Sequence, residues 1–196
     1  IAAGYADRVI ALTSSHFASA QKEFRFPLEY GSQRPLYASW TVTGSAAFLL
    51  QEGNANGKST TGRQIKNVLE SEHGYKVGIT GVTVGKIEDF GIKDSFNMGC
   101  AMAPAAAWTI STHFKDFGRT PDDYDAIFTG DLGSVGQQAL FNLLSQEDID
   151  ISENHYDCGM LIYDAKKQDV HAGGSGCGCS AVVLSAHILP KLAKKQ

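Results

Sequence analysis

The stretch 124–136, YDAIFTGDLGSVG, decides the fold class. Residues 124–129 are mostly apolar or aromatic and predict a strand, and a helix is expected to follow and to run to Leu144. Between them stands a glycine-rich turn that contains Asp131. A strand that passes through a glycine turn into a helix is a unit of layered α/β proteins, in which ligands bind beyond the carboxyl ends of the strands.

The same alternation of strands and helices extends in both directions from this stretch. Residues 8–13 predict a short buried strand, and residues 40–51 predict a strand with a Gly-Ser kink. Residues 77–90 alternate Val, Ile and Gly and predict a long strand. We expect a helix over 104–117 that begins with its proline, and a last helix over 180–195. The sequence therefore predicts an α/β fold.

The composition and charge of the chain argue against several classes of function. The chain has 196 residues, of which 43% are hydrophobic and 19% charged, as in an ordinary globular protein. Its net charge is -4, from 17 basic and 21 acidic residues, and it has no basic stripe. Nucleic acid and anionic membranes are therefore not expected as electrostatic partners. No apolar run reaches the roughly 18 residues of a membrane span.

A glycine loop ahead of the last helix is the sharpest candidate site. Residues 172–180 read AGGSGCGCS, and the candidate ligand-binding residues in it are Gly173, Gly174, Ser175 and Gly176. Successive glycines let the backbone approach a ligand, and free N–H groups before a helix favour an anion. The loop matches neither the dinucleotide-binding nor the P-loop pattern. Tight packing of a helix on a sheet explains the glycines equally well, so both interpretations stay open.

Further candidates follow two of the predicted strands. Ser14, Ser15 and His16 end the first strand and offer two hydroxyl groups and an imidazole. Asp131 follows the strand over 124–129 and is suited to be a ligand or a base. The structural alternatives are a histidine that only accepts or donates a hydrogen bond, and an aspartate that orders a glycine turn.

The four cysteines indicate a reducing compartment and neither a metal site nor a nucleophile. Cys177 and Cys179 are spaced more closely than paired zinc ligands, and further ligands are lacking. Nothing in the surrounding sequence predicts a reactive thiolate. We expect small thiols in close-packed turns.

Several motifs, in order along the chain, closely resemble the stage V sporulation protein AD family. They are TSSH at 13–16, FRFP at 24–27, EYG at 29–31, TVTGS at 41–45, MAPAAA at 102–107, GRTPDDYD at 118–125, TGDL at 129–132 and AGGSGC at 172–177. The resemblance covers nearly the whole chain except residues 53–75, which look like an insertion.

The resemblance implies a thiolase-like fold with layers α/β/α/β/α, built from two pseudo-equivalent halves. Residues 1–52 would end the first half, 53–75 would be the insertion, and 76–196 would form most of the second half. On this resemblance the N-terminal strands and the segment with the nucleophilic cysteine would lie before residue 1 and a final strand would lie beyond residue 196, so we expect an incomplete fold. We expect such a chain to associate or to dissolve poorly when it is produced alone.

The resemblance also implies a function in spore formation. The family is expected to bind dipicolinic acid (pyridine-2,6-dicarboxylate), with or without calcium, for its uptake into the developing spore. Expected partners are other proteins of the same operon, which form a channel at the spore inner membrane, and a second copy in a homodimer. The protein would be made in the cytoplasm and lie at the membrane as a peripheral protein. Calcium, as the dipicolinate complex, is the one cofactor implied, and Asp131 is the acidic candidate to meet it.

Two departures from the condensing enzymes of this fold speak against catalysis. Gly130 or Asp131 stands where those enzymes carry a catalytic histidine, and 173–175 replace the expected asparagine. Each missing oxyanion donor removes ~3–4 kcal/mol of transition-state stabilisation. We therefore expect a non-catalytic scaffold. The alternative is an active acyltransferase whose cysteine lies upstream of this chain and whose base is His16.

Overall fold

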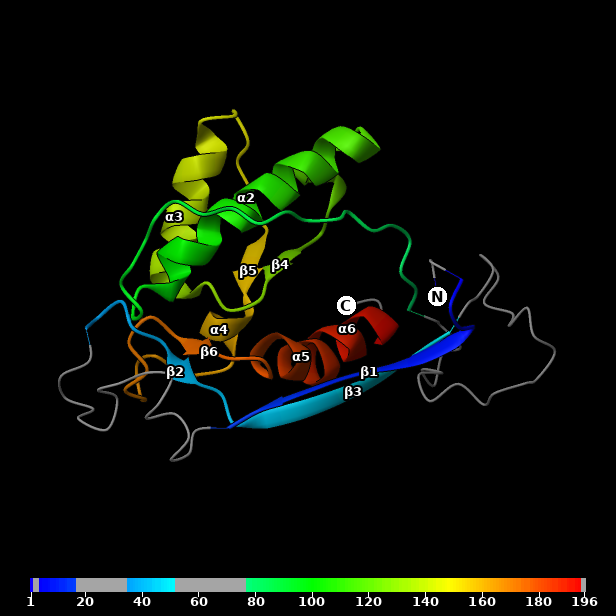
Figure 1. Ribbon diagram of the computed structural model, residues 1–196, viewed down its shortest axis with the longest axis horizontal. Helices are drawn as coiled ribbons and strands as arrows, with labels where there is room; N and C mark the ends of the chain where they lie inside the picture. The colour runs from blue at the N-terminus through cyan, green and yellow to red at the C-terminus, as the bar shows by residue number, and fades with distance from the viewer. Residues whose placement is uncertain (2–3, 17–34, 52–76, 195–196) are drawn as a thin grey trace.

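The computed structural model describes residues 1, 4–16, 35–51 and 77–194. The predicted insertion at 53–75 lies outside these residues. The described chain combines helices with three two-stranded sheets, so the predicted α/β class is confirmed. The thiolase-like layering stays a prediction. Figure 1 shows the longest helices on one side of the molecule and the longest strands on the other.

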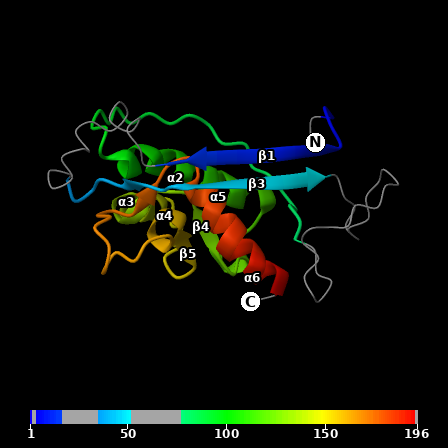
Figure 2. The ribbon, with the colours of Figure 1, turned by 90° about the horizontal axis from the view of Figure 1, so that it is seen from below.

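The longest strands form an antiparallel hairpin. β1 (Arg8–Ser15) pairs with β3 (Gly44–Gln51), in a register that sets Ser15 opposite Gly44. One face of the hairpin packs on α5 (Cys179–Val183), because a Cβ on Gly44 would lie 2.8 Å from a methyl group of Val182. Figure 2 shows the two strands side by side.

The other face of this hairpin is uncovered, which corrects the expectation of a buried strand over 8–13. Ile10 and Leu12 are 65% and 74% exposed, and Leu49, opposite Ile10, is exposed as well. An apolar run does not reveal whether one or both faces will be covered. Within the described residues only one face has a layer on it.

Two short parallel pairs support the candidate site. β4 (Ile127–Thr129) pairs with β5 (His155–Asp157), and β2 (Trp40–Thr41) pairs with β6 (Gly174–Ser175). The strand predicted over 40–51 is thus divided, and its two parts join different sheets. Between β5 and β6 lies the short helix α4 (Cys158–Leu161).

Two helices pack together and carry the larger core. They are α2 (Met98–Phe117) and α3 (Gly133–Ser145), and their backbones approach closely, since a Cβ on Gly136 would lie 2.7 Å from the Cα of Gly99. Between the two helices and β4 lie buried Ala103, Phe114 and Leu140 with their neighbours. The helix predicted to run to Leu144 is therefore confirmed.

α2 begins earlier than predicted. Asn97 caps it, because its side-chain oxygen accepts a hydrogen bond of 3.3 Å from the N–H of Cys100. Pro104 therefore lies inside the helix, not at its first position, and removes one helical hydrogen bond. The predicted end is confirmed, since Gly118 terminates the helix with φ of 59°. A 3-10 turn, η2 (Pro121–Asp123), leads on to β4.

The long strand predicted over 77–90 is not formed. The structure assigns this segment no regular secondary structure, and among the described residues no strand pairs with it. It instead runs across α2 as an extended segment (Figure 1). A strand needs a neighbour for its backbone hydrogen bonds, and periodicity in one segment cannot supply that neighbour.

The C-terminal helix is confirmed over 179–194. It consists of α5, a π-helical turn η3 (Leu184–Ile188) and α6 (Leu189–Lys194). Its buried face, which includes Cys179, Val183 and Ile188, packs with Val42 and Cys158 in a second core. No helix in the described part of the chain is both long and apolar enough to cross a bilayer.

Candidate functional site

The glycine loop is packed closely on its neighbours on several sides. A Cβ on Gly173 would lie 2.8 Å from the carbonyl oxygen of Gly159, and one on Gly174 would lie 2.8 Å from the side chain of Ile162. Gly173 and Gly176 also have φ of 127° and 112°, which favours glycine. Tight packing, one of the two interpretations of these glycines, is therefore present in the structure. The hydrogen bonds of the loop bear on the other interpretation, which is ligand binding.

Two N–H groups of the loop are held by side chains from elsewhere in the chain. The N–H of Gly176 donates to Asp131 Oδ2 at 3.0 Å. The N–H of Gly178 donates to Ser15 Oγ at 2.9 Å, and that hydroxyl donates to the carbonyl of Val42 at 2.8 Å. A carboxylate and a hydroxyl thus occupy donors that an anionic ligand would use.

The predicted site residues divide into three groups. Ser15, Asp131 and Gly176 come together in this hydrogen-bonded cluster. Ser14 lies on the opposite, exposed face of β1 across from Ser45, because successive strand residues point to opposite sides. His16 is exposed just after the end of β1.

Ser175 and its neighbours are part of a sheet. The carbonyls of Gly173 and Ser175 accept hydrogen bonds from the N–H groups of Trp40 and Val42, each 2.8 Å long. Ser175 is 0% exposed. A ligand could reach the Ser175 hydroxyl only if the surrounding chain moved. Direct contact between Ser175 and a ligand therefore stays a prediction, and it requires that movement.

A buried carboxylate that the sequence analysis missed holds the turn in which Asp131 stands. Asp157, 1% exposed, accepts hydrogen bonds from the N–H groups of Leu132 at 2.9 Å and Gly133 at 3.0 Å. It also accepts from the Thr129 hydroxyl at 2.7 Å and from the N–H of Met160 at 3.2 Å. The only sequence signal was an acidic residue directly before a short helix, which is a common cap.

A chain of polar groups continues from Asp157 to the surface of α3. The Thr129 hydroxyl donates to Asp157, so the Nε2–H of His155, 3.0 Å away, donates to Thr129 Oγ1. His155 Nδ1 then accepts from the Gln137 amide at 3.0 Å. This arrangement requires a neutral imidazole, and burial lowers the pKa of His155 although the Asp157 charge opposes that shift.

The cysteines near the loop have different environments. Burial raises the pKa of Cys158 and Cys179 to about 12, and the nearby carboxylates add to the effect. Cys177 is free and exposed, and its carbonyl accepts a hydrogen bond from Thr13 at 3.1 Å. Cys158 and Cys179 are thus unsuited to nucleophilic catalysis at neutral pH. No group of three potential metal-binding side chains was found among residues that the structure describes.

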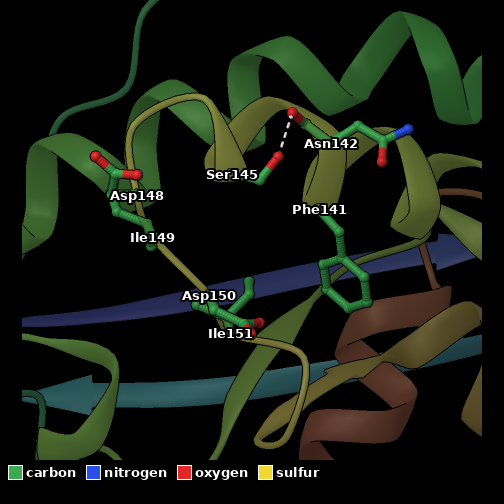
Figure 3. Close-up of a pocket in the computed structure, with 7 residues that line it drawn as sticks. All are labelled: Phe141, Asn142, Ser145, Asp148, Ile149, Asp150 and Ile151. Carbon is green, nitrogen blue, oxygen red and sulfur yellow. Dashed lines mark hydrogen bonds between the residues drawn. The ribbon is translucent and has the colours of Figure 1, made fainter.

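A hollow of about 420 Å³ lies elsewhere, at the C-terminal end of α3 (Figure 3). It combines apolar side chains with two carboxylates, and its lining residues are Phe141, Asn142, Ser145, Asp148, Ile149, Asp150 and Ile151. The N–H of Ser152 lowers the pKa of Asp150, so that carboxylate stays charged. An acidic, open hollow does not suit a dicarboxylate ligand, and no predicted site residue lines it.

The hydrogen bonds of the cluster around Gly176 define the chemistry that it offers. Its donors are backbone N–H groups, and its internal acceptors are one carboxylate and one hydroxyl. A ligand carboxylate that entered would take a donor from Asp131 and place two negative charges close together. A cation between them would remove that repulsion. Residues 130–132, at the turn after β4, include no histidine, so the turn offers no imidazole base.

Comparison with known proteins identifies one family. A sequence model of the family described as Stage V sporulation protein AD matches residues 1–196. A protein named Stage V sporulation protein AD from Bacillus subtilis (strain 168) is 47% identical over 189 residues. The alignment covers 96% of this chain and 50% of that relative, so the chain spans about half the length of the curated relative.

Proposed function

The chain belongs to the stage V sporulation protein AD family, and from this membership we propose that it binds dipicolinic acid for its uptake into the developing spore. Membership in the family supports a role in sporulation. The proposal is more specific than this role, because it names a ligand and a binding site.

The observation that carries the proposal is the meeting of three chain segments at one cluster. The end of β1 contributes Ser15, the turn after β4 contributes Asp131, and the loop after β6 contributes the N–H groups of Gly176 and Gly178. Backbone N–H groups and hydroxyls are suitable donors for a planar molecule with two carboxylates. The ligand would replace Asp131 as the acceptor at Gly176.

Calcium enters the proposal through the same carboxylate. Released from Gly176, Asp131 would face a ligand carboxylate, and Ca²⁺ prefers oxygen ligands of this kind. The proposed species is therefore the dipicolinate anion together with calcium. We propose no resident metal or other cofactor.

We propose that the scaffold is not catalytic. Gly130 and Asp131 follow β4 in place of a histidine, and the thiol pKa values of Cys158 and Cys179 are raised by burial. An acyltransferase whose nucleophile lies outside this chain is the competing function. It differs from the proposal in requiring turnover of an acyl thioester.

Partners and place in the cell belong to the same proposal. We propose that the protein is made in the cytoplasm and works as a peripheral protein at the spore inner membrane, with other sporulation proteins of one membrane channel. A homodimer is also proposed. The uncovered apolar face of Ile10, Leu12 and Leu49 supports association with another protein surface.

Calorimetric titration of the protein that carries this chain tests the proposal. Dipicolinate would be added with and without calcium, and benzene-1,3-dicarboxylate, which lacks the ring nitrogen, would serve as the comparison ligand. We expect saturable heat with dipicolinate, weaker heat with the comparison ligand and no turnover of acyl-coenzyme A. Thioester turnover without dipicolinate binding would support the acyltransferase instead.

A further inference from the structure

The turn that carries Asp131 is attached to the glycine loop at two points. The carboxylate of Asp131 accepts a hydrogen bond of 3.0 Å from the N–H of Gly176. The N–H of Ser134 donates to the carbonyl of Ala172 at 2.8 Å. The turn itself is held by the buried carboxylate of Asp157, which accepts from two of its N–H groups at 2.9 Å and 3.0 Å. The position of Asp131 at the loop therefore depends on the hydrogen bonds of Asp157.

Asp157 depends in turn on the Thr129 hydroxyl and on the imidazole behind it. Asp157 Oδ2 accepts the Thr129 proton at 2.7 Å, and Thr129 Oγ1 lies 3.0 Å from His155 Nε2. A hydroxyl has a single proton, which is donated here to the carboxylate, so the imidazole N–H has to donate to the hydroxyl oxygen. The imidazole thus fixes the rotation of the Thr129 hydroxyl toward Asp157.

The other nitrogen of the imidazole meets a donor. His155 Nδ1 lies 3.0 Å from the amide nitrogen of Gln137, which can only donate. The ring is neutral in this arrangement. A second ring proton would face the protons of that amide, in a residue that is 6% exposed. Protonation therefore opposes the position of the ring, both through the contact between donors and through the burial of a charge.

The groups that face the imidazole determine when it takes up a proton. β4 presents Thr129, and α3 presents Gln137 and Phe141, whose ring centroid lies 5.3 Å from that of His155. These three side chains do not titrate. On β5 itself, the charge of Asp157 favours the proton. Burial has the larger effect and lowers the pKa of His155, so the ring is neutral at pH 7.5 and becomes charged only in acid.

We propose that His155 is a positioning residue of the binding site, whose neutral imidazole holds Asp131 at the glycine loop through Thr129 and Asp157. This inference rests on the proposed binding of dipicolinate with calcium, because Asp131 is the carboxylate proposed to meet the cation. When the imidazole takes up a proton, the ring leaves its place and Thr129 loses the donor that orients it. The turn then loosens, and calcium gains less from Asp131. Binding thus responds to pH through a histidine outside the cluster around Gly176.

Calorimetric titration of the full-length protein with dipicolinate tests the proposal. It is carried out at pH 7.5 and at pH 5.5, each with and without calcium. The measured quantity is the calcium response, which is the factor by which calcium lowers the Kd of dipicolinate. We expect this response to be at least threefold smaller at pH 5.5 in the wild-type protein. Protonation of dipicolinate affects every variant equally, so differences between variants report on the protein.

Two variants of α3 show whether the imidazole is the cause. In Gln137→Glu the new carboxylate would accept from the protonated Nδ1 and hold the charged ring in place, so the calcium response at pH 5.5 should stay within twofold of that at pH 7.5. Gln138→Glu adds the same charge at the neighbouring, exposed position and is the matched control. Its calcium response should fall as in the wild-type protein.

Deuterium exchange without ligand separates this inference from the proposed function. After correction for the intrinsic effect of pH, the amides of 130–134 should lose at least threefold of their protection at pH 5.5 in the wild-type protein and keep it in Gln137→Glu. This result without dipicolinate binding at either pH would confirm the positioning of the turn and overturn the proposed function. Equal protection of the wild-type turn at both pH values would overturn the role of His155. So would a calcium response that falls equally in all three proteins.

Discussion

The carboxylate of Asp131 accepts a hydrogen bond of 3.0 Å from the backbone N–H of Gly176, 45 residues later in the chain. This contact joins the turn after β4 to the glycine loop after β6. It means that the loop already holds an anionic group of its own. In the proposed binding, a ligand carboxylate would replace the carboxylate of Asp131 at this loop, so the charge of Asp131 is the property to test.

Gly178→Ala should destabilise the protein and disturb the loop. The new Cβ would lie 2.7 Å from the carbonyl oxygen of Gly44 and 2.8 Å from Ser15 Oγ. Overpacking of this kind costs ~1–3 kcal/mol. Urea denaturation measures the change, and Gly78→Ala is the control because its Cβ would meet no atom within 4 Å. Equal stabilities for the two variants would contradict the packing described for the loop.

The cysteines should react with iodoacetamide in a fixed order. At pH 8 a thiol with a pKa of about 12 is ionised in only about one molecule in ten thousand, so Cys158 and Cys179 should stay unmodified in the folded protein. Cys177, which is exposed, should be alkylated first. Mass spectrometry of peptides after timed alkylation gives the order, and unfolding in urea should make all of them react. Early modification of Cys179 would show that its environment is not as described.

His155 should make stability depend on pH. Its pKa is lowered in the folded state by burial, so the unfolded state binds the proton more readily. The contribution of neutral His155 to the free energy of unfolding is fully present above the pKa of about 6.5 that histidine has in the unfolded chain. This contribution is lost as pH falls below that value. The free energy of unfolding should therefore decrease between pH 7 and pH 5, and less so in His155→Gln. An identical pH dependence in the variant would exclude this imidazole as the cause.

Several elements could be predicted from the sequence because their signals are local. The helix after Asp131 and the C-terminal helix carry apolar residues at helical spacing behind a glycine turn, and both formed as expected. The start of α2 was missed because Pro104 suggested a first position. Asn97, which caps the helix, is a weaker sequence signal for a helix start than the nearby proline.

The other differences between the sequence predictions and the structure depend on contacts between segments that are distant in sequence. Ser14 and Ser15 are equivalent in sequence, and only the register of β1 against β3 decides which of them meets the glycine loop. The sequence did not indicate that Asp157 holds the turn of Asp131, because its partners Leu132 and Gly133 lie more than twenty residues earlier. The segment 77–90 was predicted as a strand from its alternation of Val, Ile and Gly, but pairing needs a neighbour, and in the described residues no strand pairs with it.

Calorimetric titration of Asp131→Asn with dipicolinate tests the central claim most directly. Asparagine keeps an acceptor for the Gly176 N–H and removes the charge, and Asp125→Asn, an exposed position just before β4, is the matched control. Loss of the repulsion should tighten binding of dipicolinate without calcium by roughly tenfold, which corresponds to about 1.4 kcal/mol. Calcium should then strengthen binding far less than in the wild-type protein. If Asp131→Asn and Asp125→Asn both bind as the wild-type protein does, with the same response to calcium, the ligand does not meet Asp131 and the proposed site is wrong.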